Sequence, residues 1–195
     1  MTKTKNKRNV AGVAERNRIA LASLKLANDK VFKKLSERER LNLIEEVINI
    51  GDEAARGLIA AYKIDDPRKI AVKLGLRILG ETRGTLKRSE YRPHKHEIAI
   101  SKRFHEKLLA EVRSRELAER LLKLVVANEL FHHLEETQLG SVDKRYKFTV
   151  WQLGPFKINR QVKGLSEVAA QAFTHTLLGL DLTPPLFDYL LLATF

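Results

Sequence analysis

The chain of 195 residues contains no cysteine. This absence excludes disulfide bonds and every zinc site built from thiolates, and it fits the reducing cytoplasm, where we expect the protein to be located. No apolar run reaches the roughly 20 residues that a membrane-spanning helix needs, so we expect neither a spanning segment nor a membrane partner. No apolar stretch follows the basic N-terminus, so we expect no secretion signal.

Acidic residues are scarce relative to basic ones, with 24 Asp and Glu against 36 Lys and Arg and a net charge of +12. Residues 1–40 alone hold twelve Lys and Arg against four Asp and Glu, a net charge of +8. This charge indicates an anionic partner, so a weak nucleic-acid contact through residues 1–40 is one hypothesis. A solvated, solubilising helical face is the other, because no aromatic platform or reading motif accompanies the charge.

Helical periodicity dominates the first third of the chain. Residues 1–9 are polar and basic, and we expect a disordered tail there. Apolar residues recur at helical spacing over 10–35, and Ser36-Glu-Arg-Glu39 is typical of a capping box that opens a second helix. We expect Gly51 to break that helix and a third helix to run over 53–64. The chain thus divides into a tail (1–9), a helical N-terminal segment (10–64) and a mixed region (65–195).

The mixed region begins with a clear helix start, because Asp66 can act as cap and Pro67 suits the first helical position. Gly75 is a natural stop for that helix. The pattern that follows predicts an α+β fold with a small sheet. The expected elements are strands at 76–79 and 96–101 separated by a basic, irregular stretch, helices at 116–138 and 166–178, a hairpin or loop at 145–160, and a last helix from residue 184.

The expected helix over 116–138 carries polar residues on an apolar stripe. At about 100° per residue, Asn128 and His132 fall in the middle of that stripe and Glu129 at its edge. Two polar side chains one turn apart on the most buried face need partners. A metal ion or hydrogen bonds to a neighbouring helix would provide them. The stripe is formed by Leu117, Leu121, Leu124, Val125 and Phe131.

The same helix reads Asn128-Glu-Leu-Phe-His132, one residue away from the zincin motif H-E-x-x-H. Its context resembles the metallopeptidases of the ImmA/IrrE family, which have a short helix ending in L-G, an I-x-I-[NS] strand, the motif helix and a later E-x-x-A-[ND]-x-F-A-x-x-L-L helix. The matching segments here are 66–75, 96–101, 127–134 and 167–178, so the resemblance covers about residues 65–180 and leaves residues 1–64 outside it.

The resemblance implies a zincin-like motif helix followed by a helix that supplies a third ligand. It places Asn128, His132 and Glu167 at the metal-ligand positions and makes Glu129 the general base. The implied cofactor is zinc, bound weakly or not at all, because an asparagine amide is a poor zinc ligand beside imidazole. His175 is a possible auxiliary ligand.

Other histidines and simpler roles stay open at this point. His133, His94 and His96 are alternative ligands from outside the family positions, although we expect His133 to be solvated. Asn128 and His132 can equally form a buried amide–imidazole hydrogen bond. Glu167 directly follows Ser166 and can be an acidic first-turn residue favoured by the helix dipole.

Three functions compete on this evidence. The first is metal-dependent limited proteolysis of a regulatory protein, as the resemblance implies. The second is a catalytically inactive pseudopeptidase that binds a protein or peptide in the same cleft, which Asn128 favours. The third is a basic, helical nucleic-acid-binding protein, which only the charge of residues 1–40 favours.

Overall fold

The computed structural model describes residues 15–82, 88–111, 114–153 and 156–180. Helices dominate it, together with one three-stranded and one two-stranded sheet, so the predicted α+β class is confirmed. The expected basic tail (1–9) and the expected last helix from residue 184 lie outside the described residues.

The helix expected over 10–35 is shorter than predicted. Its described part is helical from residue 15 to residue 26, and a turn follows. Asp29 explains the ending, because its Oδ1 accepts hydrogen bonds of 2.8 Å from the backbone N–H groups of Val31 and Phe32. An aspartate that caps its own turn competes with helix continuation, and here it starts the short 3₁₀ turn η1 (Phe32–Lys34).

The second predicted helix, α2 (Glu37–Tyr62), opens with the expected capping box, in which Ser36 and Glu39 satisfy each other's backbone N–H groups. The predicted break at Gly51 is wrong, because α2 continues through it for eleven more residues. Gly51 lies against α7 (Leu165–Leu177) so closely that a Cβ atom there would lie 2.1 Å from the carbonyl oxygen of Ala169. The glycine permits close helix packing rather than ending the helix.

Helix α3 (Pro67–Lys73) starts as predicted, with the Asp66 side chain accepting from the Arg68 backbone N–H. The expected strands are present as β1 (Arg77–Glu81) and β3 (Glu97–Ser101), which pair in parallel. The stretch expected to be irregular contains one more strand, β2 (Ser89–Arg92), which pairs antiparallel with β3. The sheet order is therefore β1-β3-β2.

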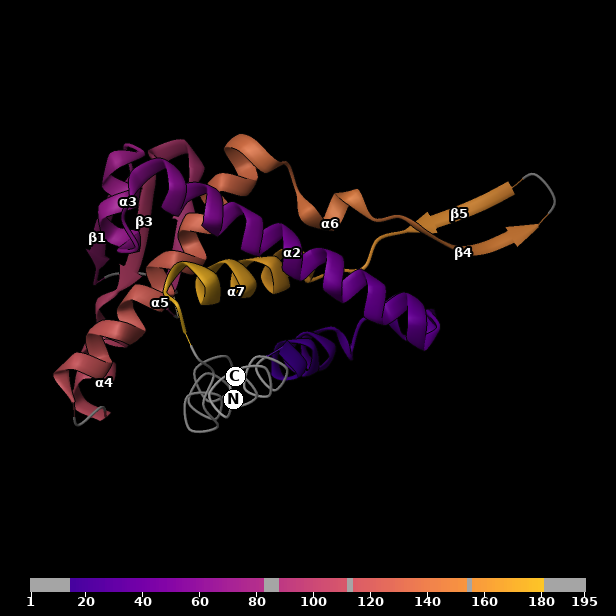
Figure 1. Ribbon diagram of the computed structural model, residues 1–195, viewed down its shortest axis with the longest axis horizontal. Coiled ribbons are helices and arrows are strands. Elements are labelled where there is room, and N and C mark those ends of the chain that lie inside the picture. Colours follow the sequence, from indigo (N-terminus) through magenta and orange to yellow (C-terminus); the bar gives the residue numbers. More distant parts are fainter. Residues whose placement is uncertain (1–14, 83–87, 112–113, 154–155, 181–195) are drawn as a thin grey trace, which may run out of the picture.

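The second half of the chain carries the motif helix and a hairpin. Ser114 caps α5, whose last turn passes into a π-helical turn, η3. The expected hairpin is confirmed and extends away from the rest of the fold (Figure 1). The remaining bounds are α4 (Lys102–Glu111), α5 (Arg115–Leu134), η3 (Glu135–Leu139), α6 (Val142–Arg145), β4 (Phe148–Leu153) and β5 (Phe156–Arg160).

One main apolar core joins the N-terminal helices to the mixed region, since its buried residues run from Ala22 to Leu177. The shorter helix α7 lies alongside part of α2 (Figure 1). Helix α5 packs between α7 on one side and the sheet with α3 on the other. Polar side chains of α5 can therefore face either α7 or strand β2. No helix in the described ranges is both long and apolar enough to cross a membrane.

Candidate functional site

A cavity of about 520 Å³ lies where the helix over 15–26, α4, α5, α7 and strand β2 meet. Leu121, Leu124 and Val125 line it, and Asn128 and His132 follow on the same face of α5. The stripe that the sequence assigned to the most buried face is largely buried, since Leu121, Leu124 and Phe131 belong to the apolar cores. Part of this stripe also borders the cavity. The other faces of α5 are buried as well, because this helix is covered on two sides. Asn128 and His132, which border the cavity, are half-buried.

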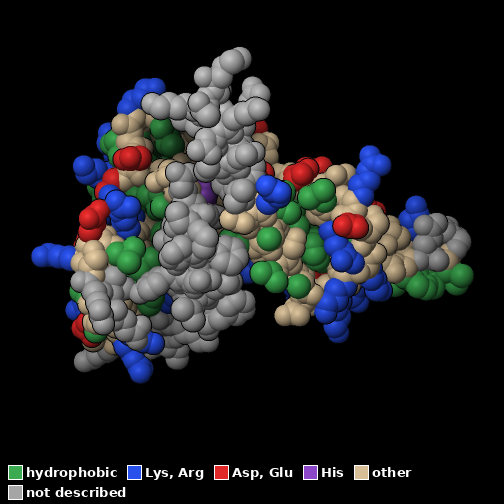
Figure 2. All heavy atoms as spheres, turned by 60° about the horizontal axis from the view of Figure 1, so that its bottom comes forward, with side chains coloured by type: hydrophobic (Ala, Val, Ile, Leu, Met, Phe, Trp, Pro, Cys, Tyr) green, Lys and Arg blue, Asp and Glu red, His purple; other side chains and the backbone are tan. Residues whose placement is uncertain are grey.

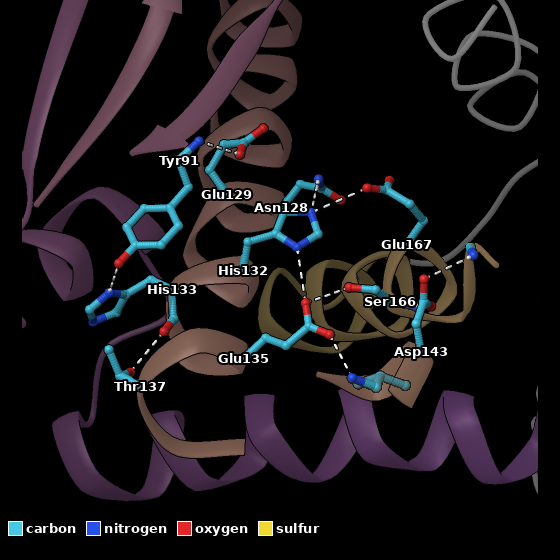
Figure 3. A network of polar contacts seen from close by, with 12 residues as sticks. Tyr91, Asn128, Glu129, His132, His133, Glu135, Thr137, Asp143, Ser166 and Glu167 are labelled. Carbon is cyan, nitrogen blue, oxygen red and sulfur yellow. Dashed lines mark hydrogen bonds and ion pairs between the residues drawn. The ribbon is translucent and has the colours of Figure 1, made fainter. Parts of the chain in front are cut away.

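His132 is the centre of the polar contacts at this cavity (Figure 3). Its Nε2 lies 3.3 Å from Glu167 Oε1 and 3.5 Å from the Asn128 amide, while its Nδ1 lies 3.4 Å from Glu135 Oε2. The structure thus brings together the three residues at the expected ligand positions, with Glu167 from α7 facing α5. It also adds a carboxylate, Glu135, on the other side of the imidazole.

The two carboxylates make His132 a cation at neutral pH. Burial alone lowers the pKa of His132, but hydrogen bonds to Glu135 and Glu167 outweigh it and raise this pKa to about 10. The same hydrogen bond to His132 lowers the pKa of Glu167. The atom of the Asn128 amide nearest to Nε2 is Nδ2, which is a donor. Because both ring nitrogens then carry protons, exchanging the amide nitrogen and oxygen would turn the acceptor Oδ1 toward Nε2.

Glu135 is fixed in place by hydrogen bonds from the start of α6 and from the first turn of α7. Its Oε1 accepts a 2.7 Å hydrogen bond from the Val142 N–H, and its Oε2 accepts from the Ser166 hydroxyl. Burial raises the pKa of Glu135, but the hydrogen bonds from His132, Ser166 and Val142 lower this pKa by more than burial raises it, so the net shift is downward. Asp143 accepts from the backbone N–H groups of Ser166 and Gly164, which ties the first turn of α7 to the short helix α6.

Sequence reasoning missed Glu135 as a site residue. The available signal was its position three residues after His132, which places the two side chains on one helix face. The contribution of Ser166 through its hydroxyl was not visible in the sequence, because it depends on how α7 meets the π-helical turn.

Glu129, the expected general base, is hydrogen-bonded to strand β2 through both carboxylate oxygens. Its Oε1 accepts a 2.7 Å hydrogen bond from the Ser89 hydroxyl and its Oε2 a 2.8 Å hydrogen bond from the Tyr91 N–H, and the residue is buried. Glu129 thereby anchors β2 to α5. A carboxylate with both oxygens held in this way is poorly placed to take a proton from a water in the cavity.

The remaining histidines lie away from His132. His133, expected to be solvated, is instead buried at 5% exposure, with its Nδ1 3.0 Å from the Tyr91 hydroxyl. Burial lowers the pKa of His133, so the neutral ring can accept from that hydroxyl. His94 and His96 are exposed around the 3₁₀ turn η2 (Pro93–Lys95). His175 lines the cavity two turns after Glu167, about 12 Å further along α7.

The residues present do not fit a catalytic zinc ion. Such an ion takes three protein ligands at about 2 Å. The 3.3 Å between His132 Nε2 and Glu167 Oε1 suits two neighbouring ligands, and Glu135 on Nδ1 resembles the usual outer support of a zinc-binding histidine. The third position offers only the neutral amide of Asn128. Within the described ranges, no group of three or more His, Cys, Asp or Glu residues is arranged to hold a metal ion.

The charged state of His132 predicts a specific loss of stability in alkali. A group whose pKa rises from 6.5 to about 10 on folding stabilises the protein fully below pH 6.5, and this contribution disappears as the pH rises toward 10. We expect the free energy of unfolding to fall over this range more steeply in the natural chain than in His132→Gln, measured by urea unfolding. The exposed His94→Gln should retain the natural slope; equal slopes in all three proteins would contradict the ion-paired imidazolium.

Compared with models of protein families, with curated proteins and with solved structures, the chain gives no match. The site itself holds one imidazolium between two carboxylates, beside a neutral amide.

Proposed function

We propose that this chain is a metallopeptidase-like protein of the ImmA/IrrE type that binds a peptide segment of a partner protein in its cleft and does not cleave it with zinc. The observation that carries the proposal is the state of His132. A zinc ligand must offer an unprotonated nitrogen, whereas the hydrogen bonds to Glu135 and Glu167 stabilise the protonated ring.

Two further contacts support binding without catalysis. Asn128 supplies no second imidazole at the position four residues before His132. Both carboxylate oxygens of Glu129 already accept hydrogen bonds from strand β2. Limited proteolysis by the zincin route needs both groups. The present role of Glu129 is structural, since it fixes the β2 edge of the cleft.

The lining of the cavity favours a peptide with apolar side chains. Leu121, Leu124 and Val125 of α5 contribute apolar lining, and the charged pair of His132 and Glu167 also lines the cavity. Such a combination of an apolar surface with a few polar groups is typical of a site that binds apolar side chains and orients a polar backbone.

The proposal is tested with untagged protein by zinc analysis, peptide cleavage and peptide binding. We expect less than one zinc per chain and no cleavage of labelled, unstructured decapeptides, together with binding of a subset that is seen by fluorescence polarisation. Val125→Asp, which places a charge in the cavity wall, should weaken binding by at least about tenfold.

Val72→Asp is the matched control, because Val72 is 65% exposed on α3 and its substitution should leave binding unchanged. One zinc per chain with metal-dependent cleavage would favour limited proteolysis over this proposal. Equal binding by both variants would show that peptides do not use the cavity.

A further inference from the structure

The distal part of the β4–β5 hairpin carries a cluster of exposed apolar side chains. Trp151 is 49% exposed, Leu153 65%, Phe156 72% and Ile158 48%. Trp151 pairs with Ile158 and Leu153 with Phe156, so the four side chains share one face of the hairpin. A solvent-exposed cluster of this kind marks an interaction surface rather than a packing requirement.

The four side chains of this cluster are not part of the main apolar core. Phe148 and Val150, near the base of β4, pack against the main core, whereas no other described helix or strand packs extensively on the two strands. The hairpin protrudes from the body of the molecule (Figure 1), and Figure 2 shows hydrophobic side chains along one of its edges. A two-stranded hairpin gains little stability alone, so a second surface is needed to cover its apolar face.

Basic residues are concentrated on the hairpin and at its base. Residues 142–163 contain six Lys and Arg against one acidic residue, Asp143, whose oxygens already accept from the first turn of α7. The basic residues lie on the element before the hairpin, on its strands and after it, so positive charge lies along the hairpin and at its base. They are Lys144, Arg145, Lys147, Lys157, Arg160 and Lys163, and all six are exposed.

We propose that the hairpin docks onto an anionic lipid bilayer, with its apolar end entering the interfacial region and its basic residues contacting the headgroup phosphates. Trp and Phe suit the boundary between headgroups and acyl chains, and each Lys or Arg close to an anionic surface adds to the electrostatic attraction. The net charge of +12 of the whole chain acts in the same direction. Nucleic acid would explain the charge but not the exposed Leu153 and Ile158.

This inference departs from the expectation of no membrane partner, which depended on the absence of a spanning segment. Docking at a surface requires no such segment, because shallow burial of a few side chains together with electrostatic attraction is sufficient. The proposal is also independent of the peptide cleft, since the hairpin shares no residue with the cavity lining.

The only tryptophan of the chain, Trp151, reports directly on this docking. We expect a blue shift of its fluorescence, and co-sedimentation of the full chain, with vesicles of phosphatidylcholine and phosphatidylglycerol but not with phosphatidylcholine alone. High salt should weaken the binding, because screening removes the electrostatic part. The double variant Leu153→Ser/Phe156→Ser keeps Trp151 and should lose at least about tenfold in vesicle affinity.

Leu24→Ser and Val72→Ser are matched controls, because these residues are 57% and 65% exposed elsewhere on the surface. Both should bind vesicles like the natural chain, and circular dichroism verifies that every variant is folded. Equal vesicle binding by the folded double variant would overturn the proposal. A blue shift with a DNA oligonucleotide but not with vesicles, or self-association without vesicles that the double variant abolishes, would overturn it in favour of nucleic acid or a second copy.

Discussion

Replacing Asn128 with histidine is expected to raise the zinc affinity of this protein at least about 100-fold. Position 128 precedes His132 by one helical turn, and its amide already lies 3.5 Å from His132 Nε2, so a histidine there would present a second imidazole toward the same point. With Glu167 3.3 Å from that nitrogen, the variant would contain the two-histidine, one-glutamate set of catalytic zinc sites. Zinc binding then has to displace only the proton on His132.

Competition with a chelator measures the affinity, and a thermal melt with and without zinc gives an independent measure, because tight binding to the folded state raises its stability. Asn128→Gln is the matched control, since it changes the side chain without adding an imidazole. Adding Glu167→Gln to Asn128→His should remove most of the gain. Equal, negligible affinity in a folded Asn128→His variant would show that the three positions do not converge, and the resemblance would then be limited to the fold.

The fold was most predictable where the signal was local. Ser36 and Asp66 cap their helices through contacts within three residues, and a sequence displays such contacts directly. Strand β2 escaped prediction because Ser89-Glu-Tyr-Arg92 is short and lacks an apolar alternation, and it is held by pairing with β3 and by Glu129. Its stability is a tertiary property that no local pattern contains.

The site was predictable in part for the same reason. Spacing on one helix indicated that Asn128 and His132 share a face, and the family resemblance indicated Glu167, which the structure places 3.3 Å from His132. The helical periodicity could not reveal that this face also borders a cavity, because α5 is covered on two sides. The partners of Glu129 were equally hidden, since they come from a strand 38 to 40 residues earlier.

Gly51→Ala is expected to lower the free energy of unfolding by about 3 kcal/mol or more, although alanine is the better helix former. A Cβ atom at this position would lie 2.1 Å from Ala169 O, 2.7 Å from Phe173 N and 2.9 Å from Ala172 Cβ. Two of these neighbours are backbone atoms of α7, so no side-chain rotation relieves the overlap. Helices α2 and α7 must separate, and α7 carries Glu167 of the candidate site.

Gly57 of the same helix provides the matched control. It is exposed, and a Cβ atom there would have nothing within 4 Å, so Gly57→Ala should stabilise the protein by about 0.5–1 kcal/mol through its helix propensity alone. Urea unfolding of the two variants therefore separates packing from propensity within one helix. If Gly51→Ala were as stable as Gly57→Ala, helices α2 and α7 could not be as close as the structure places them.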